Sequence, residues 1–429
     1  MINSAFVNIW NQRVGAISWN SETGIGSFEY DKSFLNSNLE LSPLLMPLSQ
    51  GNRIFEFREN RNSITFKGLP GLVADVLPDK YGNALINNWL TRQGRPTNSL
   101  NPVELLCFIG QRGMGALEFE PVQPKSNAIS SKLEIQSLVE IAEKILSGRK
   151  DFTVNIDEEE EKALFEILKI GSSVGGARAK ALIAFNEKTG EVRSGQAIAP
   201  KGFEHYLIKF DGVTDSQFGS AVGYGRVEMA YYNMAIEAGI EMMESRLLEE
   251  NGRAHFMTKR FDRMNGTDKI HVQTFCAMRH FDFNEIQLYS YEELFETMRE
   301  LGLSYPEAQQ LFRRMVFNVL AKNCDDHTKN FAFMMNQQGK WKLAPAYDVC
   351  HAYRPGSDWV SQHALSVNGK RKDISKADFL VVAKTMNIKN ANEIIEEVAN
   401  ACAKWIEFAQ EVNVSSELTN SIASTFVKI

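Results

Sequence analysis

The chain reads NCDDHTKN over residues 323–330 and APAYD over residues 344–348. The first stretch gathers two carboxylates, amide, imidazole and amine groups in a short turn after an apolar helix, and a strand hairpin separates it from Asp348. Phosphoryl transfer uses these residue types, because one Asp orients or deprotonates the accepting hydroxyl while an Asn and a second Asp hold Mg²⁺ on the phosphates. The two stretches together predict a phosphoryl-transfer site.

The spacing within the turn distinguishes its side chains. Asn330 follows Asp325 by five positions, which is the separation between the base and the metal-binding Asn in the catalytic loop of protein kinases. Asp325 is therefore the candidate base, in preference to Asp326, and Asp348 is the candidate second metal ligand. The His-Arg and Phe-Gly pairs that flank these positions in protein kinases are absent. A polar turn capped by Asp325, with His327 on the surface, is the alternative.

The bulk composition excludes several classes of protein. A chain of 429 residues with 44% hydrophobic and 23% charged residues is long enough for two or three domains, or for one large two-lobed domain with a proper core. The net charge of −6 argues against the chain itself being the main nucleic-acid binder. Five scattered cysteines without CxxC spacing indicate reduced thiols. With no signal segment and no apolar run of membrane length, we expect a cytoplasmic protein.

The N-terminal third predicts a β-rich module without a catalytic site. Residues 5–30 alternate apolar and polar positions between turns, which is typical of a small antiparallel meander, and a further strand ends at Pro121. Two more strands and two helices are expected, at residues 53–57, 63–66, 69–93 and 101–107. Polar residues 122–131 indicate a linker.

The middle of the chain holds a candidate phosphate loop and a candidate phosphate lysine. Residues 171–180 read GSSVGGARAK, and glycines let backbone N–H groups approach a phosphate closely. The stretch lacks the Lys-Ser/Thr of a Walker A loop, and a tight turn into the strand at 179–185 explains it equally well. Lys209 closes an apolar strand, where a lysine can reach nucleotide phosphates. A lysine extending into solvent from a sheet edge is the alternative.

The remaining predicted strands and helices lie before and after the polar turn in the sequence. Asn251-Gly252 predicts a hairpin between strands at 245–249 and 255–261. Capping boxes at Ser290 and Ser304 predict helices over 291–301 and 305–321, the second ending beside Asp325. Strands and helices of the C-terminal half are expected at residues 331–335, 341–343, 376–386, 391–412 and 415–427.

Taken in order, these motifs resemble the HipA family of bacterial serine/threonine kinases. The resemblance covers nearly the whole chain and rests on FKGLPG, LPD, the 171–180 stretch, TKRFDR, NCDDHTKN and LAPAYD. It implies an α+β fold: a two-lobed, protein-kinase-like and phosphoinositide-kinase-related architecture with a β-rich N-terminal region and an α-helical C-terminal lobe. The implied domains are an N-terminal subdomain at 1–122, a kinase N-lobe at 123–262 and a C-lobe at 263–429.

The resemblance also implies roles for individual residues. Asp325 is the catalytic base, His327 accompanies it in the catalytic loop, and Asn330 and Asp348 bind Mg²⁺. The implied nucleotide ligands are Lys209, which also acts in catalysis, Lys180, Val174 and the adenine-hinge residues Lys259, Arg260 and Phe261. Ser173 falls on the serine that the family autophosphorylates, and the neighbouring Ser172 is the alternative acceptor.

The function implied by the resemblance is Mg-ATP-dependent serine/threonine protein phosphorylation by the growth-inhibiting toxin of a type II toxin–antitoxin system. The implied partners are a HipB-like helix-turn-helix antitoxin, DNA only through that antitoxin, and a protein substrate such as an aminoacyl-tRNA synthetase or another translation factor. No membrane partner is expected. Two other functions stay open on the same scaffold: a catalytically weak binding module and a small-molecule kinase.

Overall fold

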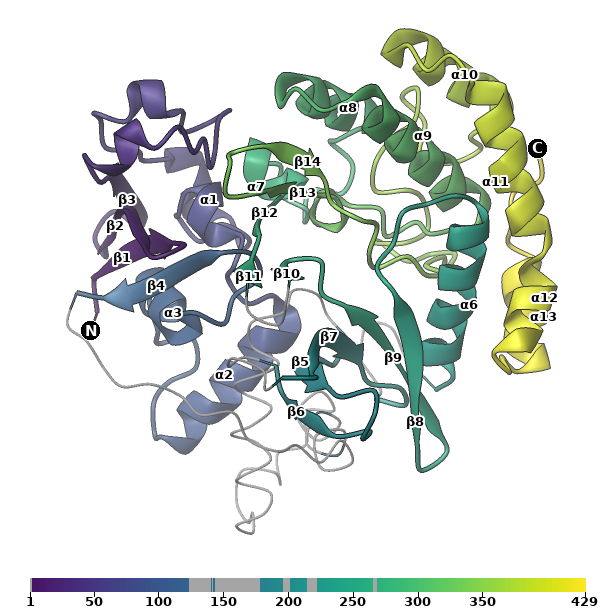
Figure 1. Ribbon diagram of the computed structural model, residues 1–429, viewed down its shortest axis with the longest axis horizontal. Helices are drawn as coiled ribbons and strands as arrows, with labels where there is room; N and C mark the ends of the chain where they lie inside the picture. The colour runs from purple at the N-terminus through teal and green to yellow at the C-terminus, as the bar shows by residue number, and fades with distance from the viewer. Residues whose placement is uncertain are drawn as a thin grey trace. The chain divides into compact units, whose positions relative to one another are not determined.

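The computed structural model describes residues 2–122, 140, 142, 178–195, 201–213, 222–264 and 268–429 (Figure 1). The chain forms two compact units. The first comprises Met1–Val222, Leu248–Val272 and Asn336–Gly339, and the second comprises Gly223–Leu247, Gln273–Met335 and Lys340–Ile429. The regions expected as an N-terminal subdomain and a kinase N-lobe thus share one unit, apart from residues 223–247, which belong to the second.

An antiparallel sheet at the N-terminus confirms the predicted meander and its additional strand. Its strands, in the spatial order β3-β2-β1-β4, are β1 (Ser4–Ile9), β2 (Gln12–Asn20), β3 (Ile25–Tyr30) and β4 (Leu117–Pro121). Trp10 and Asn11, with φ of 46° and 62°, form the two-residue turn between β1 and β2, as type I′ hairpins require. The predicted helices appear as α1 (Gly71–Ala74), α2 (Lys80–Arg92) and α3 (Pro102–Ile109). Of these, α3 packs on β1, β2 and β4.

The two other strands expected here, at residues 53–57 and 63–66, are wrong. Only Phe55 makes a bridge, to Phe28, and the 3-10 helix η3 (Arg58–Asn62) follows it. Ser63 Oγ then accepts hydrogen bonds from the N–H groups two and three residues later, at 3.1 and 3.0 Å. Such bonds from a short polar side chain to nearby backbone compete with strand pairing.

A second, five-stranded sheet carries the candidate lysines. Its strands, in the spatial order β6-β5-β7-β9-β8, are β5 (Lys180–Phe185), β6 (Val192–Ser194), β7 (Glu204–Lys209), β8 (Ser245–Glu250) and β9 (Arg253–Lys259). Asn251 and Gly252 have φ of 45° and 77° and form the predicted hairpin turn. Because β7 is a central strand, Lys209 is not an edge residue.

A buried carboxylate in the first unit binds two guanidinium groups after β9. Asp262 accepts hydrogen bonds from Arg260 Nε at 2.8 Å, from Arg263 Nη1 at 2.8 Å and from the Gly115 N–H at 2.7 Å. Arg263 also donates to the carbonyls of Gly115 and Gly113, both at 3.0 Å. Burial alone would raise the pKa of Asp262, but the two guanidinium groups hold it well below its usual range. These bonds attach residues 113–115 to the segment that follows β9. A short antiparallel hairpin of β10 (Arg263–Met264) and β11 (Asp268–Lys269) comes next in the chain.

The second unit is mainly helical, as predicted. Its helices are α6 (Tyr224–Glu237), α7 (Phe275–Arg279), α8 (Tyr291–Glu300), α9 (Tyr305–Leu320), α10 (Lys376–Met386), α11 (Ala391–Ala403), α12 (Trp405–Glu411) and α13 (Ser416–Ala423). Both predicted capping boxes, at Ser290 and Ser304, are present. Helix α11 packs on α9 and α6, and α12 packs on α6 (Figure 1).

The prediction of one continuous helix over 391–412 is wrong, because the helix breaks between α11 and α12 at Lys404. Trp405 begins α12 and is buried. Its ring centroid lies 5.3 Å from that of Tyr231 on α6, and its Nε1 donates to Thr419 O at 2.9 Å. The break accompanies the packing of this indole into the core.

A small sheet supports the polar turn. Strands β13 (Ala332–Met335) and β14 (Trp341–Leu343) pair antiparallel as predicted, and the unpredicted β12 (His271–Thr274) lies on the other side of β13.

None of the helices in the described part of the chain has the length and apolar character that a membrane span requires.

Candidate active site

Helix α9 ends in a Schellman motif from which the polar turn begins. Lys322 adopts a left-handed φ of 53°. Its N–H bonds to Val319 O at 3.4 Å, and the next N–H, that of Asn323, bonds to Asn318 O at 2.9 Å. These two bonds satisfy carbonyls at the end of the helix. A bridge between Asn323 and Ala352 then holds the chain as it leaves the helix.

Asp325 and Asp326 have opposite environments. The Asp325 side chain keeps 35% of its surface exposed, whereas that of Asp326 is fully buried. Asp326 Oδ1 accepts the Ala364 N–H at 2.8 Å, and its Oδ2 bonds to the Tyr291 hydroxyl at 2.8 Å and to His363 Nδ1 at 3.0 Å. Asp326 is thus a structural anchor, while the Asp325 carboxylate is partly exposed.

The Asp326–His363 pair forms a buried ion pair. Burial alone would lower the pKa of His363, but the adjacent carboxylate raises it to about 10. The other ring nitrogen, Nε2, lies 3.7 Å from the buried Cys324 Sγ. Removing one member of a buried pair typically costs about 3–5 kcal/mol, so the conformation of the turn depends on both partners.

His327 caps the short 3-10 helix η5 (Thr328–Asn330). Its Nδ1 accepts the Lys329 N–H at 3.2 Å, and its ring centroid lies 5.1 Å from that of Phe283. Its Nε2 is 3.8 Å from Asp325 Oδ1, which is too long for a hydrogen bond. His327 therefore borders the candidate base without bonding to it.

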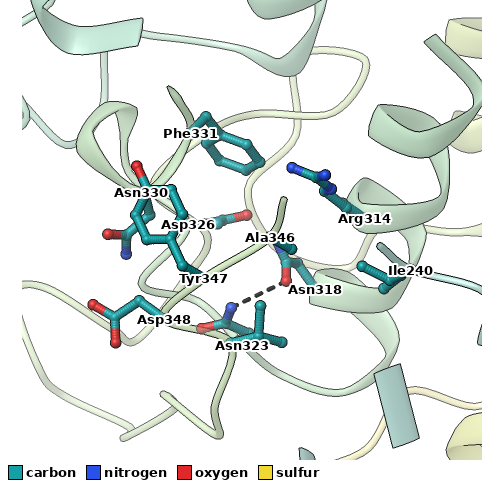
Figure 2. A pocket seen from close by; sticks show the side chains of 11 residues that line it. Ile240, Arg314, Asn318, Asn323, Asp326, Asn330, Phe331, Ala346, Tyr347 and Asp348 are labelled. Atoms are coloured by element: carbon teal, nitrogen blue, oxygen red, sulfur yellow. Dashed lines mark hydrogen bonds between the residues drawn. The ribbon is translucent and has the colours of Figure 1, made fainter. Parts of the chain in front are cut away.

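Asn330 and Asp348, the two predicted metal ligands, line one pocket (Figure 2). Asn330 Nδ2 donates to the Asp325 carbonyl at 2.7 Å, which turns its Oδ1 away from that carbonyl. Asp348 has a left-handed φ of 55°. For a residue other than glycine this conformation costs about 1–3 kcal/mol and is concentrated at functional sites.

Hydrogen bonds of the two preceding residues hold Asp348 in place. The Ala346 N–H bonds to Glu241 O at 2.8 Å, in the segment that follows α6. The Tyr347 hydroxyl donates to Lys329 O at 2.7 Å. The two stretches that the sequence singled out are therefore bonded to each other directly.

The donor set suits a magnesium–nucleotide complex better than a self-contained metal centre. Asn330 and Asp348 offer amide and carboxylate oxygens, which Mg²⁺ prefers, and this ion usually keeps several waters and binds substrate phosphates as well. Within the described ranges, no group of three or more His, Cys, Asp and Glu side chains could hold a metal ion. A cation bound here would complete its coordination with water and phosphate oxygens.

The predicted phosphate lysines lie in the first unit. Lys180 on β5 and Lys209 on β7 face each other directly in the sheet register, and both are buried. Lys209 Nζ is 6.0 Å from the centroid of the Phe256 ring. Directly opposite residues on neighbouring strands share one face of the sheet, so both ammonium groups lie on the same face.

The predicted hinge residues are largely engaged within the first unit. Lys259 Nζ lies 2.5 Å from Glu204 Oε2. The Arg260 side chain bonds to Asp262, and its N–H bonds to His205 O at 2.9 Å. Neither the guanidinium nor the N–H of Arg260 is available to bind a base. Phe261 lies two residues beyond the end of β9 and is partly exposed.

Three predicted loop residues, Ser172, Ser173 and Val174, lie outside the described residues.

The structure also adds polar residues to the site that the sequence did not single out. Tyr291 and His363 meet Asp326 from 35 and 37 positions away, too far for any local motif to connect them. Asn323 is the first residue of the 323–330 stretch. The sequence assigned it no role, and the structure places it in the lining of the pocket with Asn330 and Asp348.

Comparisons with known proteins agree with this fold. The HipA N-terminal domain matches residues 5–120, and the HipA-like C-terminal domain matches residues 172–406. A Sinorhizobium fredii protein named "Putative kinase Y4mE" is 23% identical over an alignment of 455 positions, which covers 98% of this chain and 96% of that protein. A chain of the Shewanella oneidensis MR-1 toxin–antitoxin complex of HipA, HipB and operator DNA shares the fold, with a TM-score of 0.67, 16% identity, and coverage of 98% of this chain and 94% of that chain. Since the C-terminal domain match alone spans more than half of its residues, this chain belongs to the HipA family.

Proposed function

We propose that this protein is a Mg²⁺- and ATP-dependent kinase that phosphorylates serine or threonine hydroxyls of proteins. The observation that carries the proposal is the pocket shared by Asn330 and Asp348, with Asn330 bonded to the backbone of Asp325. Membership of the HipA family and the name of the S. fredii relative support the same class of enzyme.

In this proposal Asp325 is the general base. Its carboxylate accepts the proton of the substrate hydroxyl while that oxygen bonds to the γ-phosphorus and the bond to the departing ADP oxygen breaks. Asn330 and Asp348 hold the cation, and bound Mg²⁺ offsets the charge on the phosphate oxygens. Because Asp348 is fixed by its neighbours, its carboxylate needs little rearrangement to act.

Lys209 and Lys180 are the proposed phosphate ligands, a role that their burial at facing positions supports. Val174 and the backbone around Phe261 are proposed to contact the nucleotide as well.

We infer that the protein acts in the cytoplasm as a toxin, that it pairs with a HipB-like antitoxin which contacts DNA, and that its substrate is a translation factor such as an aminoacyl-tRNA synthetase. The complex of HipA with HipB and operator DNA supports, by analogy, the proposed pairing with an antitoxin. The free cysteines support a reducing compartment.

The experiment is intact-mass measurement after incubation with Mg-ATP, followed by phosphosite mapping. We expect the wild-type protein to gain one phosphate on Ser173 or Ser172, and Asp325→Asn to gain none. Incorporation that is undiminished in Asp325→Asn would contradict the mechanism. A wild-type protein that binds Mg-ATP but phosphorylates neither itself nor a protein substrate would instead favour a binding module or a small-molecule kinase.

A further inference from the structure

The amide oxygen of Asn323 is buried without a hydrogen-bond partner in the described part of the chain. The residue is only 4% exposed, and it lines the pocket that also contains Asn330 and Asp348. Native proteins rarely leave a buried polar atom unsatisfied, and each such atom indicates a water, an ion or a functional role.

A chain of hydrogen bonds fixes which end of the Asn323 amide faces the pocket. The carboxylate of Asp326 has no hydrogen to donate, so the Tyr291 hydroxyl donates to it, at 2.8 Å. The phenol has then used its hydrogen, and its oxygen accepts Asn318 Nδ2 at 3.0 Å. Asn318 Oδ1 in turn accepts Asn323 Nδ2 at 3.0 Å. Because every step has only one allowed direction, Asn323 must present its oxygen to the pocket.

We propose that Asn323 is an additional residue of the cation site, whose Oδ1 accepts a hydrogen bond from a water molecule in the hydration shell of a divalent cation held by Asn330 and Asp348. The inference rests on the proposed function, because it takes the same pocket to bind a metal–nucleotide complex. It adds a residue that coordinates through water and a relay that orients it.

The arrangement of the pocket agrees with this role. Figure 2 shows the Asn323 oxygen turned away from Asn318 and toward the side of the pocket where Asp348 lies. Arg314, whose Nε is also buried without a hydrogen-bond partner among the described residues, lies on the other side of Asn323 in this view. Its positive charge is therefore separated from the carboxylate that would hold the cation.

The chemistry of magnesium explains why such an acceptor helps. Mg²⁺ loses its waters reluctantly and usually keeps several of them when a protein binds it. Water on a divalent cation is a strong donor, and the groups that accept from it orient the whole complex; their loss typically weakens metal affinity about 10–100-fold. A reversed Asn323 amide would point its NH₂ group at those donors and disfavour binding.

The test uses Mn²⁺ as the probe, with the full-length protein and a non-hydrolysable ATP analogue, and follows the free Mn²⁺ signal by electron paramagnetic resonance. We expect Asn323→Ala to weaken Mn²⁺ affinity by about tenfold or more. Tyr291→Phe should weaken it in the same direction although Tyr291 does not line the pocket, because the Asn318 and Asn323 amides lose their fixed orientation. Asn60→Ala, which alters a buried Asn of the first unit, is the matched control and should bind as the wild type does.

The outcomes separate this inference from the proposed function. If the wild-type protein binds Mn²⁺ and Asn330→Ala does not, while Asn323→Ala and Tyr291→Phe both stay within about twofold of the wild type, the inference is wrong and the proposed function stands. A lower unfolding temperature in Asn323→Ala without any change in Mn²⁺ affinity would assign its oxygen to a structural water shared with Arg314, and would equally overturn the inference. Absence of Mn²⁺ binding by the wild type would contradict the proposed function itself.

Discussion

The Tyr291 hydroxyl donates a 2.8 Å hydrogen bond to Asp326 Oδ2 and thereby ties the first residue of α8 to the polar turn. The same carboxylate binds His363 and the Ala364 N–H, from the chain beyond Asp348. Asp326 therefore joins three segments that are far apart in the sequence. Its neighbour Asp325 is left exposed, and this division between an anchor and an accessible carboxylate has measurable consequences.

Asp325→Asn and Asp326→Asn should fail in different ways. In Asp325→Asn we expect phosphate transfer to fall by about 10²–10⁴ because the base is lost, while the free energy of unfolding changes by less than about 0.5 kcal/mol. In Asp326→Asn the buried His363 loses its charge partner, and we expect a loss of about 3–5 kcal/mol. Urea unfolding and initial rates of phosphate incorporation measure both quantities. Similar stability losses in the two variants would contradict the assignment.

The Asp326–His363 pair should make stability depend on pH in the alkaline range. The pKa of His363 rises from its ordinary 6.5 to about 10 in the folded protein. A group whose pKa is higher in the folded protein than in the unfolded chain contributes its full stabilisation at pH values below its pKa in the unfolded chain. This stabilisation is lost as the pH rises through its pKa in the folded protein. The wild type should therefore exceed His363→Asn in unfolding free energy most at about pH 6, and this difference should shrink toward about pH 10.

Urea unfolding of the two proteins at several pH values measures that difference. Both should carry Cys324→Ala, so that the adjacent thiol does not titrate. A difference that stays constant from acid to alkaline pH would show that folding does not raise the pKa of this histidine.

The buried Asp262 cluster should stabilise the first unit far more than the exposed ion pair beside it. Asp262→Asn leaves two guanidinium groups without their carboxylate, and we expect a loss of about 3–5 kcal/mol. Lys259→Ala breaks only the partly exposed pair with Glu204, with an expected effect of about 0–1 kcal/mol. Hydrogen exchange at the Gly115 N–H, which bonds to Asp262, reports the local effect. Unchanged protection of Gly115 in Asp262→Asn would contradict this account.

Local sequence signals were sufficient for most of the fold. The Asn251-Gly252 turn and the capping boxes at Ser290 and Ser304 act within a few residues, and the elements that they predicted are present. The failures have physical causes of another kind. The strand expected at 63–66 does not form, and the Ser63 side chain bonds to nearby backbone there instead. The helix break after α11 accompanies packing of Trp405 against Tyr231, which is remote in sequence.

The candidate site divides in the same way. The residue types and spacing that phosphoryl transfer requires predicted that Asn330 and Asp348 act together, and the two residues line one pocket. The relay from Asp326 through Tyr291 and Asn318 could not be predicted, because hydrogen bonds between residues so far apart in the sequence leave no local pattern. Arg260 matched a hinge motif, yet its side chain bonds to Asp262, and the motif gives no sign of this contact.

The facing lysines should contribute to nucleotide affinity. We expect Lys209→Met, and separately Lys180→Met, to weaken binding of a fluorescent ATP analogue by about tenfold or more, as loss of a charged hydrogen bond of about 1.5–3 kcal/mol implies. Lys376→Met is the control, since this exposed side chain lies near Glu396 in the second unit and has no proposed role in binding. If both variants bind the ATP analogue as tightly as the control does, these lysines are not nucleotide ligands.

The central claim is that Asn330 and Asp348 hold a divalent cation on a bound nucleotide. The most direct measurement is the unfolding temperature with ATP analogue alone, with Mg²⁺ alone and with both, in the wild type and in Asp348→Asn, since Asn tolerates the left-handed backbone of this position. A ligand that binds only the folded state must raise stability, so we predict a larger shift with both ligands than with either alone, and loss of the Mg²⁺-dependent part in Asp348→Asn. An equal shift in EDTA, or an unchanged Mg²⁺-dependent shift in Asp348→Asn, would contradict the account.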